Sequence, residues 1–425
     1  MKTAIVVGAG AGGCAAAAEL AKTHKVTLLE RGTDFSPFAF SLPLLEPLRR
    51  TGAFFDPRMI SLLFGDMRVE KSADQVHVYG RGIGGTTNLA TANVLRYDAS
   101  LRELGIDLDE EFEELAELVP QITDHQDRWS PLTKRLFSIF EELGFDPSPM
   151  PKMLDLSACQ NCGLCVLGCK HGAKWTADRL LDTVDVSRLE IVRESRVDGL
   201  IIEDGEARGV ACNENSQATE RYADVIVLAA GGIGTPRILQ ASGIETQTHF
   251  FGDPVLCVAA SMPDAHADAG IPMPFASQRE GYILSPYFDY LSFFFHKDWR
   301  KPANSILSLM IKLADDEAGA VLPSSIETKL TEHDIETYAH AVNDCLAVLH
   351  ELGIEEDETF LGLVNEGHPG GTLPLTRNEA QSLHNPALPS SLYIADSTLF
   401  PQSMGNPPIL TIMALAKKVA KVIAS

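Results

Sequence analysis

The first thirty residues carry the pattern that most constrains the fold of this 425-residue chain. A β-branched run at residues 3–7 ends in Gly8-Ala9-Gly10-Ala11-Gly12-Gly13, and an alanine-rich segment typical of a helix follows over residues 14–20. A second apolar run, Lys25 to Leu29, closes with Glu30. Strand, G-x-G-x-x-G, helix, strand and acid, in this order, predict a parallel α/β sheet that binds a dinucleotide.

Each part of this unit has a physical role in holding a dinucleotide. Gly8, Gly10 and Gly13 let the backbone come close to a pyrophosphate, and the N-terminus of the helix supplies amide donors. Glu30 is positioned to accept hydrogen bonds from ribose hydroxyls, which disfavours a ribose 2'-phosphate. The unit alone does not separate FAD from NAD, and a plain glycine-rich turn is the structural alternative.

Composition narrows the class of protein. The net charge of -23 repels phosphate backbones and anionic lipid headgroups, and no Lys/Arg stripe offsets it, so nucleic acid is not an expected partner. No apolar run reaches the roughly 20 residues that a membrane span requires. Glycines interrupt the apolar stretch from Ala4 to Ala18, which favours a nucleotide-binding unit over a signal peptide. We therefore expect a soluble, cytoplasmic protein without a membrane span.

Three further segments carry long motifs. Residues 80–87 read GRGIGGTT, and residues 225–239 read VIVLAAGGIGTPRIL. Near the C-terminus, HPGGT at residues 368–372 precedes LYIADS at 392–397 and GNPP at 405–408. Together these segments resemble the signatures of the glucose-methanol-choline (GMC) oxidoreductases, FAD enzymes that mostly oxidise alcohols, and they follow the family order from one end of the chain to the other.

The resemblance implies FAD as cofactor, and an α/β fold in which a Rossmann-like FAD-binding domain is interleaved with a mixed-sheet, α+β substrate domain. It implies an FAD-binding domain at residues 1–34, 76–100, 189–245 and 384–425, and a substrate-binding domain at 246–383. The cofactor contacts that it implies are Gly8, Gly10, Gly13, Glu30, Arg31, Gly84, Gly85, Thr86, Thr87, Asn88, Val197, Gly231, Asp396 and Asn406.

Two features depart from the family pattern. Ala90 stands where an Asn or His usually follows the hydroxyl pair of the first signature, with Asn88 and Asn93 nearby. The chain is also short for the family, so the loops of the substrate domain are expected to be trimmed. Asp396 is expected near the flavin pyrophosphate or ribityl chain, and its structural alternative is an ordinary turn after a strand at residues 392–395.

His368 and Asn406 occupy positions at which family members place a catalytic His and an Asn or second His. Alcohol oxidation needs a base for the hydroxyl proton while the hydride passes to flavin N5, and an imidazole can serve as that base. The amide of Asn406 can stabilise the developing alkoxide. The structural alternatives are a loop histidine at 368 and, at 406, a helix N-cap just before proline.

Four of the eight cysteines fall within residues 151–178, where Cys159-x2-Cys162-x2-Cys165-x3-Cys169 has the spacing of bacterial ferredoxin clusters. This spacing predicts an iron-sulfur cluster, with 4Fe-4S favoured and 3Fe-4S open. Zinc and a disulfide are the alternatives. A more distant cysteine could replace one of the four ligands, the candidates being Cys14, Cys212, Cys257 and Cys345.

Residues 170–174, KHGAK, look like the segment after the cysteines in long-chain alcohol oxidases of this family. Their positive charge could guide an acidic electron carrier. A flavin accepts two electrons as hydride and a cluster takes one at a time, so the pair predicts an alcohol dehydrogenase that passes electrons to an external carrier or partner subunit. Two alternatives stay open: a reductase of carbonyls or activated alkenes, and a non-catalytic electron-transfer subunit.

The segment between the second signature and His368 is less readable. Residues 282–299 are rich in aromatic side chains, which either wall a pocket for an apolar substrate or, more often, form sheet core. Residues 306–314 are typical of a strand, and residues 332–352 have the apolar spacing of an amphipathic helix. The sequence does not identify the substrate.

Overall fold

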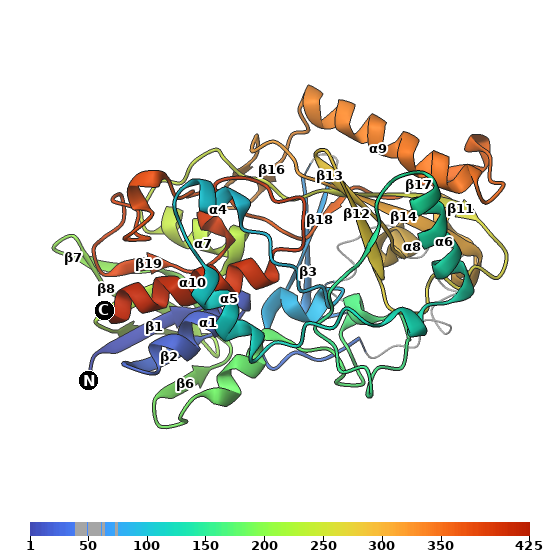
Figure 1. The fold of residues 1–425 in the computed structure, drawn as a ribbon. Helices are drawn as coiled ribbons and strands as arrows, with labels where there is room; N and C mark the ends of the chain where they lie inside the picture. Colours follow the sequence, from blue (N-terminus) through green and yellow to red (C-terminus); the bar gives the residue numbers. More distant parts are fainter. Residues whose placement is uncertain (39–48, 50–60, 62–63, 73–74) are drawn as a thin grey trace.

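The computed structural model describes residues 1–38, 49, 61, 64–72 and 75–425. Figure 1 shows the arrangement of the described chain: a parallel sheet lies at the end that carries both termini, and a larger mixed sheet lies at the opposite end beneath a long helix, α9 (Glu332–His350). The predicted α/β fold, with a parallel sheet and a second, mixed sheet, is confirmed.

The smaller of these two sheets is entirely parallel. Its central strands are buried over most of their length, which explains why they are short runs of β-branched and aliphatic residues. The strands predicted at residues 3–7 and 25–29 are both present. In spatial order, the sheet consists of β19 (Leu392–Ile394), β10 (Val225–Leu228), β1 (Thr3–Val7), β2 (Lys25–Leu29) and β6 (Leu189–Val192).

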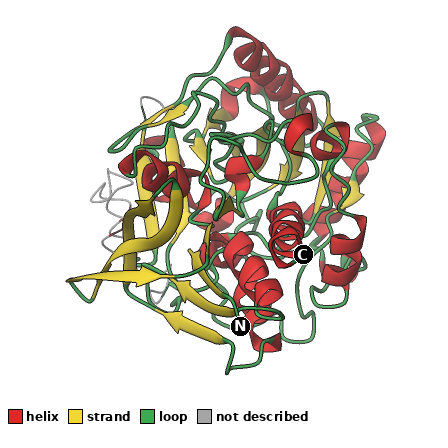
Figure 2. Ribbon diagram, turned by 90° about the vertical axis from the view of Figure 1, so that its left-hand side faces the viewer, coloured by secondary structure: helices red, strands yellow, loops and turns green. Residues whose placement is uncertain are grey.

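Two helices pack side by side against this sheet: α1 (Ala11–Leu20) and α10 (Ile409–Ala424). The alanines of α1 allow close approach, and Lys417 Nζ lies 2.6 Å from Glu19 Oε2 across the contact. The first and last elements of the chain therefore belong to one packing unit. Figures 1 and 2 accordingly show both termini on the same side of the molecule.

The larger sheet is mixed and is built mainly from antiparallel pairs. Its central strand β14 is buried along its whole length, as expected for a predicted strand at 306–314. The path runs β3 (Met67–Lys71), β4 (Val76–Gly80), β18 (Asn365–Glu366), β11 (Val255–Ser261), β14 (Ile306–Leu313), β13 (Tyr282–Pro286), β12 (Phe275–Arg279) and β5 (Ser148–Pro149), and β17 (Thr359–Leu361) pairs with β11.

Helix α9 covers this larger sheet and confirms the amphipathic helix predicted over residues 332–352. A capping box starts it, because Thr331 accepts from the backbone N–H of Asp334 while Asp334 accepts from that of Thr331. Its buried face packs on the core that surrounds β14. The buried residues of that face are Tyr338, Ala341, Cys345, Val348 and Leu349.

The remaining elements surround the two sheets. A three-stranded antiparallel sheet joins β7 (Ser195–Glu203), β8 (Glu206–Glu214) and β9 (Gln217–Tyr222), and a small hairpin joins β15 (Ala320–Val321) and β16 (Ile326–Glu327). Further α-helices of the described residues are α4 (Ala99–Glu103), α5 (Asp109–Ala116), α6 (Pro131–Glu142), α7 (Gly231–Ala241) and α8 (Tyr290–Phe295). None of the helices in the described ranges is long and apolar enough to cross a bilayer.

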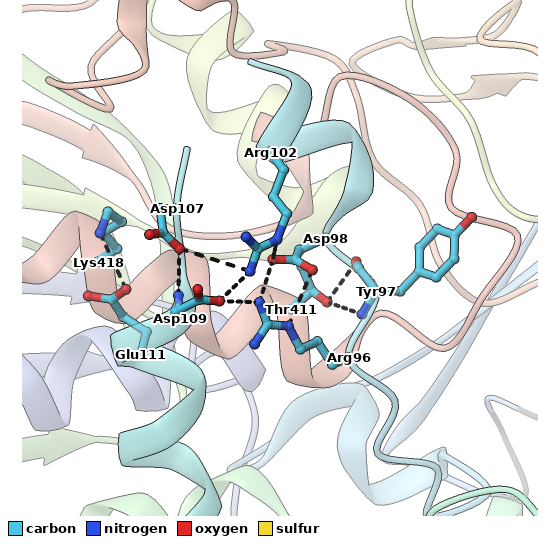
Figure 3. Close-up of polar contacts among 9 residues, drawn as sticks. All are labelled: Arg96, Tyr97, Asp98, Arg102, Asp107, Asp109, Glu111, Thr411 and Lys418. Atoms are coloured by element: carbon cyan, nitrogen blue, oxygen red, sulfur yellow. Dashed lines mark hydrogen bonds and ion pairs between the residues drawn. The ribbon is translucent and has the colours of Figure 1, made fainter. Parts of the chain in front are cut away.

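Ion pairs connect α4 to α5 and α5 to α10 (Figure 3). The buried carboxylate of Asp98 accepts from Arg102 Nε at 2.9 Å and from Arg96, and both guanidinium groups also contact Asp109. On the other side, Lys418 of α10 lies 3.3 Å from Glu111. This network holds the segment after residue 96 against the C-terminal helix.

Candidate active site

A large cavity of about 790 Å³ lies between the parallel sheet and the larger sheet. The chain segments that leave the carboxyl ends of β1, β2, β10 and β19 all line it, which is the edge where open parallel sheets bind ligands. The opposite wall comes from the larger sheet and from the loop that contains His368. The cavity thus joins the predicted dinucleotide loop to the predicted catalytic histidine.

The glycine loop after β1 is shaped by close backbone contacts. A Cβ atom at Gly12 would lie 1.8 Å from the carbonyl oxygen of Ala395, and one at Gly13 would lie 1.8 Å from that of Gly8. Gly10 has open space beside it, and no side chain caps the start of α1 at this residue. Gly8, Gly10 and Gly12 line the cavity while Gly13 packs behind it. The uncapped helix N-terminus is a suitable cradle for an anion such as a pyrophosphate.

Glu30, at the end of β2, holds three loops together. Its buried carboxylate accepts from the backbone N–H groups of Ala9 at 3.0 Å, Gly32 at 2.8 Å and Gly82 at 3.1 Å. Glu30 and the exposed Arg31 both line the cavity. An acid at the end of the second strand, beside the glycine loop, is where a nucleotide ribose would be expected.

The first GMC-like signature folds into a 3-10 helix, η2 (Gly85–Leu89), that touches the glycine loop. Gly85 has φ +53°, and a Cβ there would lie 2.7 Å from Gly10 Cα. Asn88 does not line the cavity; its amide donates to the carbonyls of Ile83 at 2.9 Å and Gly85 at 3.2 Å and so fixes the turn. Gly84 also lies behind the surface, whereas Gly85, Thr86 and Thr87 form part of it.

Asp396 lies at the N-terminus of α7, in the cavity wall. Its carboxylate accepts from Gly231 N at 2.8 Å, Thr235 Oγ1 at 2.6 Å and Thr398 N at 2.9 Å. Burial raises the pKa of Asp396 in spite of these donors. Gly231 and Val197 line the same part of the cavity. Through its contact with Thr398 N, Asp396 also starts the turn that follows β19, which is the alternative role expected from the sequence.

His368 lines the cavity, with 28% of its side chain exposed. Its Nδ1 lies 3.3 Å from Oδ2 of the buried Asp253, and Lys312 Nζ of β14 binds the same carboxylate oxygen. Burial lowers the pKa of His368, and the nearby Lys312 lowers it further. Burial alone would raise the pKa of Asp253, but Lys312 and His368 hold that pKa below its ordinary value. Burial and Lys312 both favour the neutral imidazole of His368, which is the form that a general base requires.

Asn406 lies close behind this group but is buried, and it is not part of the cavity wall. Its Oδ1 accepts from Gln278 Nε2 at 2.8 Å, and its Nδ2 donates to Met404 O at 3.2 Å. The N-cap of α10 is Pro408, so Asn406 does not cap this helix. Its main-chain carbonyl accepts from Lys312 at 3.2 Å. Contact of its amide with substrate or cofactor stays a prediction.

Asp253 and Lys312 are site residues that no motif in the sequence indicates. Lys312 could have been noticed, because it is the one charged residue in the otherwise apolar β14 sequence ILSLMIKL, and a buried charge in such a strand needs a partner. Asp253 has no comparable local signal. Its left-handed backbone, with φ +51°, appears only in the structure.

The aromatic stretch at residues 282–299 divides between the two predicted roles. Tyr287, Tyr290, Phe294 and Phe295 line the cavity, in a segment that begins after β13 and runs through α8. Tyr282, Phe293 and Trp299 are buried, and they belong to the core clusters of the larger sheet. One segment therefore supplies both sheet core and an aromatic wall.

The four clustered cysteines line a small cavity of about 10 Å³. Cys165 begins the 3-10 helix η4 (Cys165–Leu167), and the next two residues of η4, Val166 and Leu167, line the large cavity instead. Burial raises the pKa of Cys165 to about 11 and lowers that of the adjacent Lys174 to about 8. Lys174 Nζ donates to the carbonyl of Cys165 at 2.8 Å.

No preformed metal site supports the iron-sulfur prediction. Throughout the described ranges, no three His, Cys, Asp or Glu side chains are grouped so that they could hold a metal ion. All eight cysteines are free thiols, so the disulfide alternative is not observed either. The donor chemistry of four thiols around one small cavity suits iron or zinc.

Comparisons with known proteins agree with this architecture. The family model described as GMC oxidoreductase matches residues 3–256. An uncharacterized protein of Methanocaldococcus jannaschii is 26% identical over 430 residues, 98% of each chain. The crystal structure of pyridoxine 4-oxidase from Mesorbium loti has the same fold, with a TM-score of 0.74 over 99% of both chains at 18% identity.

Two plant proteins match over a shorter region. (R)-mandelonitrile lyase 2 of Prunus dulcis is 28% identical over 263 residues, which are 58% of this chain and 44% of the plant protein. A long-chain-alcohol oxidase of Arabidopsis thaliana is 26% identical over 271 residues, 57% of this chain and 34% of that enzyme. The chain thus spans less than half the length of these two relatives.

Proposed function

The chain belongs to the GMC oxidoreductase family, and from that premise we propose that it oxidises an alcohol with His368 as the general base. Membership implies FAD as cofactor and makes the protein an oxidoreductase that acts on CH–OH groups. The observation that carries the proposal is the position of His368. It lies in the wall of the cavity that begins at the glycine loop, with Nδ1 held by Asp253 and with no partner for Nε2 among the residues that the structure describes.

The described residues fit FAD at each of its chemical parts. The uncapped N-terminus of α1 offers amide donors to a pyrophosphate, and Glu30 offers a carboxylate to a ribose. Apolar and aromatic side chains line much of the remainder, beside charged ones such as Asp253 and Lys312, and the apolar part suits a flavin ring and an apolar substrate. We propose the predicted domain division on the same basis: the FAD-binding ranges supply the first two features and residues 246–383 supply Asp253, Lys312 and His368.

Bound FAD supplies the hydride acceptor; the chain supplies the other steps. The Nε2 lone pair of His368 takes the hydroxyl proton as the hydride leaves the carbon. The aromatic side chains of residues 287–295 exclude water from the reacting groups. We retain Asn406 as the proposed alkoxide donor, which requires its Nδ2 to give up Gln278 Oε1, 3.3 Å away, for the substrate oxygen.

We propose an alcohol with an apolar or ring-bearing body as the substrate class. Tyr287, Tyr290, Phe294 and Phe295 give the cavity an aromatic wall, and aromatic surfaces favour apolar and flat ligands. The long-chain-alcohol oxidase among the relatives is named for an apolar substrate, which agrees with this class.

The decisive experiment is an anaerobic titration of the FAD-loaded protein with primary, secondary, aromatic and long-chain alcohols. An oxidisable alcohol should reduce the flavin and so bleach the absorbance of its oxidised form at about 450 nm. The corresponding aldehyde or ketone should appear in equal amount. If the protein binds FAD and no alcohol in such a panel bleaches it, the proposed direction of reaction is wrong.

We also propose that the cysteine loop at 159–169 holds an iron-sulfur cluster that passes electrons to an external carrier in the cytoplasm. Its support is the ferredoxin-type spacing, the shared small cavity and the position of η4 between that cavity and the large one. Anaerobic reconstitution with iron and sulfide, followed by metal analysis and electron paramagnetic resonance, tests it. A protein that binds zinc in preference, or retains no iron after desalting, refutes the cluster.

A further inference from the structure

The carboxylate of Asp253 is shared by chain segments that are far apart in the sequence. Oδ2 is bound by Lys312 Nζ of β14 and by His368 Nδ1 of the loop after β18, 59 and 115 residues away. Oδ1 accepts from Ser403 Oγ and from Gly405 N at 3.2 Å. Asp253 is 1% exposed, so these four donors replace its hydration completely.

One negative charge therefore faces two basic side chains. A carboxylate paired with histidine alone favours the imidazolium form, because the charges attract. Lys312 lies against the same oxygen and offsets that attraction; it is itself buried, with only 3% of its side chain exposed. Its other contact is the carbonyl of Asn406 at 3.2 Å, and no second carboxylate binds its Nζ in the described residues.

We propose that Lys312 is a positioning residue for the proposed base: by neutralising Asp253, it lets that carboxylate orient His368 through Nδ1 while the imidazole stays uncharged and keeps its Nε2 lone pair able to take a proton. In this arrangement Asp253 fixes the tautomer and Lys312 fixes the charge. The catalytic part of the inference rests on the proposed function, whereas the charge and tautomer of His368 do not.

Other charged groups around this cluster are already engaged. Asp315 accepts from Gly252 N at 3.1 Å and Asp253 N at 2.9 Å, and burial, together with Asp253 and Glu366, raises its pKa well above the ordinary value. His77 Nδ1 lies 2.9 Å from Glu366 Oε2.

Glu317 accepts from Ser403 N at 2.9 Å. Lys312 is thus the cation placed to neutralise Asp253, and the pKa of His368 is lowered by burial first and by Lys312 second.

The test is a ¹⁵N NMR titration of the imidazoles in the FAD-loaded protein labelled at histidine, with His368→Gln assigning the signal of residue 368. In the native protein, His368 should be the Nδ1-protonated neutral tautomer at pH 7 and should titrate below the ordinary histidine value. Lys312→Gln keeps a hydrogen-bond donor but removes the charge, so the His368 titration should move up by about one pH unit or more. Lys312→Arg, the matched control, should leave it in place.

Activity gives a separate readout. The acid limb of the kcat–pH profile should follow the NMR titration upward in Lys312→Gln, with less activity at pH 6 than at pH 8. Asp253→Asn should give mixed tautomers and lower kcat more than it changes KM.

The inference is overturned if native His368 is protonated at Nε2 or charged at pH 7, a result that needs no folded Lys312 variant. It is equally overturned if Lys312→Gln and Lys312→Arg titrate alike. If the NMR results hold but His368→Gln oxidises substrate normally, the proposed function fails and the charge assignment stands.

Discussion

Two glycines of the same loop serve separate purposes at the scale of single residues. Gly12 packs against the backbone of Ala395, where a Cβ would lie 1.8 Å from a carbonyl oxygen, while a Cβ on Gly10 would meet nothing within 4 Å. Gly10 also has φ -85°, which any residue can adopt. Close packing against protein therefore requires a glycine at position 12. At position 10 the protein itself does not require one, and we propose that close approach of the cofactor does.

Substitutions at these positions should separate folding from cofactor binding. Gly12→Ala should lower the free energy of unfolding by about 2 kcal/mol or more, because rigid backbone must move to admit the methyl group. Without FAD, the Gly10→Ala variant should have the same melting temperature as the native protein. It should bind FAD more weakly, because its methyl group would occupy the pyrophosphate cradle. Thermal unfolding with and without FAD, with fluorescence titration of the cofactor, measures both effects. Equal FAD affinity in Gly10→Ala and native protein would remove the cradle from this loop.

The imidazole of His368 should matter for chemistry and not for cofactor retention. His368→Ala should reduce kcat by roughly 100-fold or more, the usual cost of losing a general base, with FAD still bound. His350→Ala, on the exposed end of α9 with 67% of the side chain accessible, is the control and should react at the native rate. Stopped-flow bleaching under anaerobic conditions isolates this step. Comparable bleaching rates in the two variants would exclude His368 as the base.

Residues with roles in local motifs could be predicted from the sequence, and residues with roles across the fold could not. Gly8, Gly10, Glu30 and His368 occur in short patterns, and all four line the cavity. Asp253 acquires its partners only when β14 and two distant loops converge, so no spacing in the sequence encodes it. The position of the Asn406 amide, turned toward Gln278, likewise depends on packing between remote segments.

Among the elements, the α4–α5 segment shows how ion pairs of different burial contribute to one contact. Asp98→Asn should lower the free energy of unfolding by about 1–2 kcal/mol, because this buried carboxylate bonds two guanidinium groups. Asp107→Asn is the matched control: its carboxylate is 70% exposed and 4.0 Å from Arg102, so the change should stay within about 0.5 kcal/mol. Denaturant unfolding of both variants measures whether burial determines how much each ion pair contributes to the free energy of unfolding. Equal losses in the two variants would contradict that dependence on burial.

Element prediction succeeded where periodicity and burial agree. β1, β2, β14 and α9 match their predicted ranges to within two residues, because each has one clear apolar pattern. The aromatic stretch at 282–299 has no such pattern, since it contains strand, loop and helix in succession. A run that is apolar throughout fits the repeat of a strand and the repeat of a helix equally well. Only tertiary packing then decides which of its side chains reach the cavity.

Across the whole molecule, the large cavity and the cysteine loop are separated by a single turn of chain. Val166 and Leu167 face the large cavity while Cys165 faces the small one, and Lys170 and His171 just beyond are exposed to solvent. If the proposed cluster forms, electrons have a short path from the cavity to the surface. Cys165→Ser should then leave alcohol-dependent bleaching of FAD intact and slow its reoxidation by a one-electron dye.

The serine substitution changes one sulfur to oxygen and leaves the FAD-binding residues untouched, so a loss confined to reoxidation reports on the loop alone. Cys345→Ser, at a buried thiol of α9 outside the small cavity, controls for the general effect of such a change. Anaerobic stopped-flow measurement of both half-reactions gives the comparison. Native reoxidation in Cys165→Ser would mean that electrons leave the flavin directly, and the four clustered thiols would then have no part in the turnover of this enzyme.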